Sequence, residues 1–179
     1  MRPHHVRSHV VEPRAHAHSF PYSAAVSGTG PSGGSSDGVA VWATFLRTHA
    51  AVVRRLEHDL ADEQGLPLSW YDVLLELQSA PERRLRMQEL GERAVLSRTR
   101  VSRIVEQLVA EGLVERQADP DDRRATFAVI TSAGHAVLRR AAPVYLRGIR
   151  DHFTSHLSDR ELRALGRGLG KVLEAQRRS

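Results

Sequence analysis

The sequence predicts a mainly α-helical protein with one small β-hairpin, an α+β fold. From Val39 onward, apolar residues recur at three- and four-residue steps, which is the period of amphipathic helices. Residues 113–131 break this period with two short β-rich runs joined by a polar turn. The 179 residues are 41% hydrophobic, enough to build the core of one domain with an extension.

Residues 1–37 are expected to be a disordered arm. The segment has four prolines, many serines and glycines, and no hydrophobic period, and "GPSGGSSDG" near its end is typical of a flexible linker. Five of the ten histidines lie in this arm, so a metal-binding tract is one alternative. Irregular histidines without cysteines or paired acids are more typical of a polar tail, and we expect neither a metal nor a cofactor.

Residues 38–179 are expected to form the folded domain. A first helix over about 39–64 carries a continuous apolar stripe and ends at Gly65 and Pro67. Ser69 is the expected N-cap of a second helix, with Asp72 three residues further on. A turn, a short extended piece and a brief helix with Leu90 inward follow. The first stripe comprises Trp42, Phe45, Leu46, His49, Val52, Val53, Leu56 and Leu60.

The stretch "LSRTRVSRIVEQL", residues 96–108, predicts a helix with an unusually basic first turn. Ser97 is its expected N-cap. A helix start carries partial positive charge, so Arg98 and Arg100 there cost roughly a few tenths of a kcal/mol. That cost is explained if a polyanion lies opposite, although Lys171 is the one lysine among 26 basic residues and arginine is used everywhere. The expected buried stripe is Val101, Ile104, Val105, Leu108 and Val109.

The last third of the chain predicts a hairpin followed by two helices. "LVERQ" and "ATFAVIT" are the expected strands, and "ADPDDRR" is the turn between them. Ser132 is the expected cap of a long helix that contains Pro143 and runs to about His152. A capping box, Ser158 with Glu161, opens the final helix. Three glycines weaken that helix by roughly 1 kcal/mol each, so we expect it to need a partner.

This order of elements is that of a winged helix–turn–helix, about residues 66–131, between terminal helices at about 39–64 and 132–177. Over residues 39–177 the chain resembles the MarR family of bacterial transcriptional regulators. "GLVERQADPDDRRATFAVITSAG", residues 112–134, is similar to the family's wing and the start of its next helix. "LSWYDVLLEL" and "LSRTRVSRIVEQLVAEGLV" resemble the preceding helices, in the same order and spacing.

The resemblance implies a homodimer, by default a repressor, that reads a pseudo-palindrome in double-stranded DNA through a helix in the major groove. Arginine can bond guanine in bidentate fashion, and serine and threonine can bond bases or phosphates. The family's Asp-x-Arg pattern falls on Asp122 and Arg124, which implies that Arg124 enters the minor groove and Asp122 orients it. Arg123 is the alternative reader. The candidate DNA contacts are Ser97, Arg98, Thr99, Arg100, Ser102, Arg103, Asp122, Arg123 and Arg124.

A small-molecule effector is also implied by the resemblance. Relatives commonly bind aromatic or phenolic compounds between the terminal helices and the DNA-binding lobe. For two candidates a structural role is the alternative. His49 is also explained as a hydrogen-bonded histidine at an interface, and Asp72 as an acidic residue near a helix start. The candidate pocket residues are Trp42, His49, Trp70, Tyr71, Asp72 and His152.

Composition and the absence of certain motifs narrow the possible partners, cellular locations and functions. A formal net charge of +5 favours an acidic partner, and the absence of cysteine excludes disulfides and thiol redox sensing. No apolar run approaches the ~18 residues of a membrane span, and the N-terminus lacks a signal core, so a cytoplasmic protein without a membrane partner is expected. The sequence contains no catalytic motif. The stretch "GRGLG" resembles a glycine-rich phosphate-binding loop only superficially, because it follows no strand. The competing functions are an RNA-binding and a protein-interaction winged helix.

Overall fold

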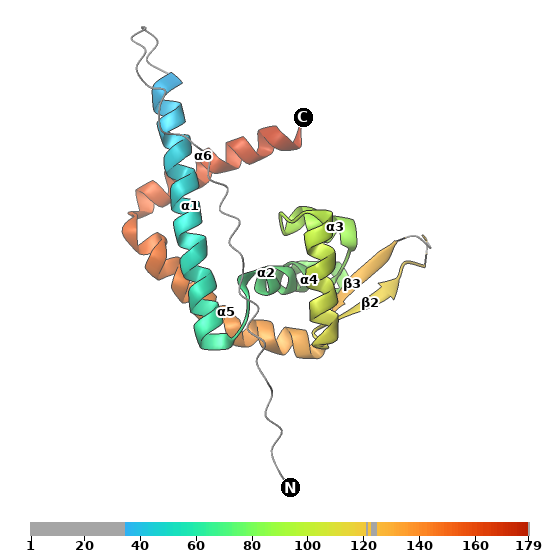
Figure 1. Ribbon diagram of the computed structural model, residues 1–179. Coiled ribbons are helices and arrows are strands. Elements are labelled where there is room, and N and C mark those ends of the chain that lie inside the picture. The colour runs from blue at the N-terminus through green and yellow to red at the C-terminus, as the bar shows by residue number, and fades with distance from the viewer. Residues whose placement is uncertain (1–34, 121, 123–124, 179) are drawn as a thin grey trace. The chain divides into compact units, whose positions relative to one another are not determined.

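The computed structural model describes residues 35–120, 122 and 125–178 (Figure 1). The chain divides into two units, residues 1–39 and 40–179, so the boundary lies inside the first helix. The arm expected over residues 1–37 lies outside the described residues as far as residue 34, and its last three residues, 35–37, belong to the first helix instead. The described elements are α1 (Ser35–Gln64), α2 (Leu68–Ser79), η1 (Pro81–Arg83), β1 (Arg84–Arg86), α3 (Met87–Arg93), α4 (Arg98–Ala110), β2 (Val114–Ala118), β3 (Thr126–Ile130), α5 (Ser132–His152), η2 (Thr154–His156) and α6 (Asp159–Arg177).

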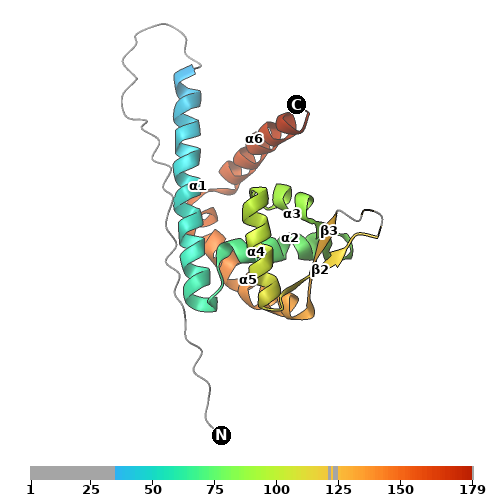
Figure 2. The ribbon, with the colours of Figure 1, turned by 45° about the vertical axis from the view of Figure 1, so that its right-hand side comes forward.

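The predicted fold class is confirmed: helices dominate, and the strands form one small antiparallel sheet in the order β1-β3-β2. The hairpin of β2 and β3 has the expected position, with Arg116 opposite Ala128. The short extended piece before α3 is strand β1, and its Leu85 pairs with Ala128 on the other side of β3. In both ribbon views the strands β2 and β3 extend outward beyond α4 (Figures 1 and 2).

The core lies where α2, α3 and α4 meet the sheet and α5. The stripe predicted for α4 is buried at Val101, Ile104, Val105 and Leu108, but Val109 is 38% exposed, so that residue was assigned wrongly. Burying side chains of this size stabilises the fold by roughly 1.5–3 kcal/mol each. The apolar residues without solvent exposure are Leu60, Val73, Leu74, Leu77, Leu90, Val105, Leu108 and Ala128.

Two helix starts are confirmed at the level of single hydrogen bonds. The Arg100 backbone N–H donates to Ser97 Oγ at 3.3 Å, so α4 has the serine cap that the sequence predicts. At α6, the Ser158 N–H donates to Glu161 Oε2 at 2.8 Å and the Glu161 N–H donates to Ser158 Oγ at 3.4 Å. Both ends therefore satisfy donors that the helix itself cannot.

Two other expected caps are wrong. Helix α2 begins at Leu68 with Pro67 at the N-cap, so Ser69 lies inside the first turn and does not cap the helix. Helix α5 is capped by Thr131, one residue before the expected Ser132. Helix α2 therefore begins two residues earlier than the residue pattern indicates, and α5 begins one residue earlier.

The terminal helices leave much of their apolar surface uncovered within this chain. Helix α6 has no buried residue, and its Leu169, Val172 and Leu173 are exposed. On α1 the stripe is buried only towards its end, at Leu56 and Leu60. The large apolar side chains exposed on α1 are Val39, Val41, Trp42, Phe45 and Leu46.

Candidate nucleic-acid interface

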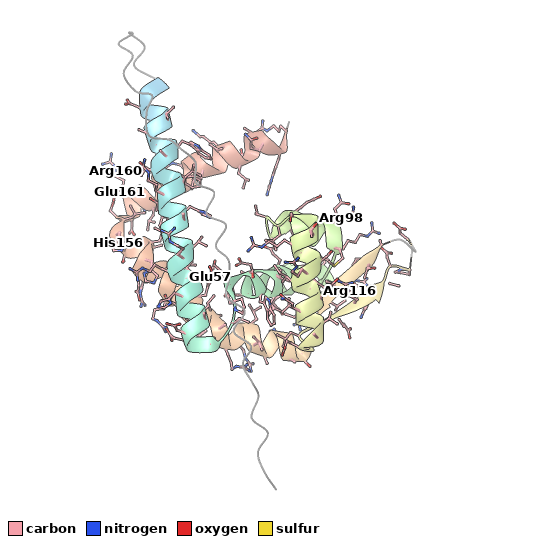
Figure 3. The ribbon with its side chains drawn as sticks, viewed as in Figure 1. Glu57, Arg98, Arg116, His156, Arg160 and Glu161 are labelled. Atoms are coloured by element: carbon pink, nitrogen blue, oxygen red, sulfur yellow. The ribbon has the colours of Figure 1, made fainter. Side chains whose placement is uncertain are left out.

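Helix α4 presents a polar, basic surface at its start. Since its inward positions follow the helical period, the residues between them point outward. Ser97, Arg98, Thr99, Arg100 and Arg103 are exposed, while Ser102 is partly covered. Figure 3 labels Arg98 at the first turn of α4. Within the described residues, the structure thus brings all six α4 candidates onto one short segment.

Contacts on both sides of α4 hold the helix in place. On one side, Trp70 Nε1 of α2 donates a hydrogen bond to Gln107 Oε1 at 3.3 Å. On the other, Arg116 of β2, labelled in Figure 3, lies 3.7 Å from Glu106. Exposed ion pairs of this kind contribute at most about 1 kcal/mol, but the two contacts together restrain rotation of α4 against its neighbours.

A notch of 330 Å³ opens between the start of α2 and the start of α4. Sequence reasoning missed the contribution of Ser69, because a serine before an apolar run is typical of a cap. Because Pro67 is the N-cap of α2, the Ser69 hydroxyl is not used for capping and lines the notch instead. The notch is lined by Ser69, Ser97, Thr99, Arg100, Arg103 and Ile104.

The tip of the hairpin is described only in part. Asp122 is exposed, whereas Arg123 and Arg124 lie outside the described residues, so the expected minor-groove contact stays a prediction. The residue at which the turn begins is described. This residue, Asp119, is 3% exposed and forms an ion pair with Arg86, with 2.6 Å between Arg86 Nη2 and Asp119 Oδ2.

Asp119 and Arg86 form a polar anchor where the hairpin turn begins, and sequence reasoning also missed it. The Arg86 guanidinium lies 5.7 Å from the centre of the Phe127 ring, and that of Arg84 lies 4.7 Å from it, so both make cation–π contacts. The anchor joins the last residue of β1 to the end of β2. In the sequence, Asp119 before a proline indicates only a turn and not a buried ion pair.

The candidate effector residues lie in separate environments. On α1, the Trp42 and Phe45 rings are 5.7 Å apart and the Phe45 and His49 rings 6.3 Å apart. His152 of α5 instead bonds Asp59 of α1, with 2.8 Å between Nε2 and Oδ2. The structure therefore does not gather these side chains into one pocket.

The α2 candidates are closer to the core. Tyr71 is buried with its ring 4.5 Å from that of Tyr145, and burial raises the pKa of Tyr71 to about 12. Asp72 is partly buried; desolvation, and then the neighbouring Glu76, raise the pKa of Asp72 to about 6. These residues and Trp70, bonded to α4, make α2 the polar and aromatic link between α4 and α5.

A larger groove of 690 Å³ runs along α1, the end of α5, η2 and α6. Its walls are mostly apolar, and they include Phe45, Leu56, Leu165 and Leu169. Of the six effector candidates, His49 is the one that lines it. The groove coincides with the stretches of α1 and α6 whose apolar side chains remain exposed.

Among the residues that the structure describes, no three His, Cys, Asp or Glu side chains are grouped so that they could hold a metal ion. None of the described helices combines the length and apolar character needed to cross a membrane.

Comparison with known proteins gives consistent matches. The sequence pattern that defines the MarR family matches residues 64–125. The structure of Sco3205, a MarR family transcriptional regulator from Streptomyces coelicolor in complex with DNA, is 32% identical in sequence. The superposition covers 81% of this chain and 91% of that one, with a TM-score of 0.72.

Two characterised relatives match over shorter stretches. The HTH-type transcriptional regulator MhqR of Bacillus subtilis is 34% identical over 42% of this chain and 52% of its own length. The transcriptional repressor MprA of Escherichia coli is 31% identical over 45% of this chain and 46% of its own. The matched stretch thus spans about half the length of these relatives.

Proposed function

Because the chain belongs to the MarR family of transcriptional regulators, which are not enzymes, we propose that it acts as a homodimeric DNA-binding repressor. It reads a pseudo-palindromic operator with α4 in the major groove and the hairpin tip in the minor groove, and a small aromatic or phenolic effector releases it. The observation that carries this proposal is the exposed, basic start of α4 beside a wing, the arrangement of a similar chain solved with DNA.

The charge at the start of α4 supports the DNA contact. Arg98, Arg100 and Arg103 are exposed, and no acidic residue lies in the first turn of the helix. Three guanidinium groups beside the positive end of a helix repel one another and the dipole, and a polyanion relieves both effects. Base edges in the major groove are within the range of arginine donors on an inserted helix.

The uncovered faces of α1 and α6 support the homodimer. Apolar side chains line the 690 Å³ groove between them, and no residue of α6 is fully buried within its own chain. A second copy that inserts its own terminal helices would cover both faces by two-fold symmetry. Two copies of α4 would then read half-sites about one helical turn apart.

Repression and effector release rest on less direct support. MprA, similar over its matched half, is a transcriptional repressor. Helix α2 carries Trp70, Tyr71 and Asp72 and bonds α4 through Gln107, so a ligand that displaces α2 would shift α4 as well. We expect the protein to act in the cytoplasm, where its DNA target would lie.

Selection of bound duplexes from a random DNA pool tests the proposal. The expected result is enrichment of a palindrome, and Ala in place of a guanine-reading arginine, tried at Arg98, Arg100 and Arg103 in turn, should cost about 1–3 kcal/mol at one base pair per half-site. Arg140→Ala, on an exposed part of α5, is the control and should leave affinity unchanged. Absence of any preferred duplex, or equal affinity for RNA hairpins, would refute the proposal.

A further inference from the structure

Ser69 has no role in capping the helix that carries it. Pro67 occupies the N-cap of α2, and the Trp70 and Tyr71 backbone N–H groups donate to the Pro67 carbonyl at 3.0 and 3.1 Å. The Ser69 side chain instead lines the 330 Å³ notch at the start of α4. A hydroxyl in that place is available to donate to a group that enters from outside.

Arg100 lies on the side of α4 that faces α2. Residues 100, 104 and 107 are spaced by four and three, so they share one side of the helix. Gln107 on that side bonds Trp70 of α2, and Ile104 is buried there. Thr99, Arg103 and Glu106, spaced in the same way, share the next side of the helix, which extends from the edge of the notch towards Arg116 of β2. Arg100 therefore points along the flank of α4 rather than directly outward.

The chemistry of the notch suits a phosphate group. Its lining offers two guanidinium groups and three hydroxyls, with no carboxylate. These are the donors that proteins direct at the oxygens of the DNA backbone. The notch is open to solvent and large enough for a phosphodiester, and the Trp70–Gln107 bond holds its two walls together.

We propose that this notch holds one backbone phosphate of the bound DNA in each half-site, with Ser69 Oγ and Arg100 as the donors. The inference rests on the proposed function and extends it, because it assigns Arg100 to the backbone and leaves the outward face of α4 to the bases. It also makes α2 a second DNA-contacting helix. Any ligand that moves α2 would then disturb the phosphate contact as well as α4.

The test uses the full chain and the duplex that it selects from a random pool. Ser69→Ala should weaken binding by about tenfold for every bound sequence, because a hydrogen bond to a charged oxygen is lost. Arg100→Gln should lower the slope of log affinity against log salt by about 1. Ser79→Ala at the other end of α2 and Arg140→Gln on α5 are matched controls and should change neither quantity.

Neutral methylphosphonates placed one at a time along the duplex identify the phosphate. At one phosphate in each half-site, methylphosphonate substitution should weaken binding of the wild type. The same substitution should cause no further loss of affinity in Ser69→Ala. Additive losses at every position, or loss of preference at a base pair in Arg100→Gln, would overturn the inference while leaving the proposed function intact. A wild-type protein that selects no duplex would overturn both.

The same notch chemistry could serve a free anion instead. Inorganic phosphate at constant ionic strength separates the two sources. If phosphate raises the melting temperature of the wild type but not of Ser69→Ala, and Ser69→Ala binds DNA normally, the notch is a small-anion site and the DNA assignment is wrong. No effect of phosphate on the free protein, with the losses above, supports the assignment.

Discussion

Asp72 shows how one side chain on α2 can make stability depend on pH. Desolvation is the larger cause of its raised pKa, from 3.8 to about 6, and Glu76 adds to it. Between these values the folded chain binds more protons than the unfolded chain, so the free energy of unfolding falls as pH rises through this window. The free-energy cost of burying the ionised Asp72 carboxylate is absent below about pH 4 and complete above the folded-state pKa.

Asp72→Asn removes that penalty. We expect the variant to be more stable than wild type by about 1–2 kcal/mol at pH 7, after screening by water is allowed for, and nearly equal to it at pH 4. Urea denaturation at the two pH values measures the difference. Asp62→Asn, exposed on α1, is the control and should show no such gain. An equal effect of Asp72→Asn at both pH values would contradict the assigned pKa.

At the scale of elements, the contact between α5 and the turn that precedes β2 depends on a glycine. A Cβ added at Gly134 would lie 2.1 Å from the Leu113 carbonyl oxygen and 2.9 Å from Ile130 Cγ1. Gly134→Ala must therefore push the first turn of α5 away from the sheet, and we expect it to destabilise the protein by about 1–3 kcal/mol. Thermal or urea denaturation checks this.

Gly168→Ala in α6 is the matched control. Nothing lies within 4 Å of a Cβ at that position, so the better helix propensity of alanine should stabilise the chain by up to about 1 kcal/mol. The two substitutions are chemically identical and should act with opposite sign. Stabilisation by Gly134→Ala would show that the close approach of α5 to Leu113 is not required.

These elements also show what sequence could predict and why. The stripe of α4 and the caps at Ser97 and Ser158 depend on residues within one or two turns, so local patterns determine them. The expected caps Ser69 and Ser132 were wrong because each helix begins one or two residues earlier, and a residue pattern locates a helix end only to within one or two residues. Boundaries of this kind are beyond the resolution of a residue pattern.

Contacts between distant segments were beyond the sequence for a different reason. The pairing of β1 with β3, the Arg86–Asp119 anchor and the notch at Ser69 all join segments far apart in the chain. Nothing in the residues near Asp119 indicates that its carboxylate is buried against an arginine of another strand. For the DNA-binding site, sequence therefore predicted the α4 residues, and the neighbours that position α4 came from the structure.

At the scale of the whole molecule, we propose that the terminal helices join two copies of the chain. If α6 binds a second copy, deletion of residues 157–179 should abolish the dimer and much of the folded signal. Two linked α4 helices gain affinity by acting on one DNA molecule, so loss of the dimer should weaken operator binding at least about 100-fold. Light scattering and operator titration measure the two effects.

A single substitution separates loss of assembly from loss of folding. Leu169 lines the apolar groove and is 41% exposed within one chain, so Leu169→Glu should cost the isolated chain little. Between two copies, the same carboxylate would be buried without a partner, which is expensive. Arg167→Glu, exposed on the opposite side of α6, adds the same group as a control and should leave the dimer intact. If Leu169→Glu remains dimeric and binds the operator as wild type does, the groove is not the interface, and two copies must meet through another surface.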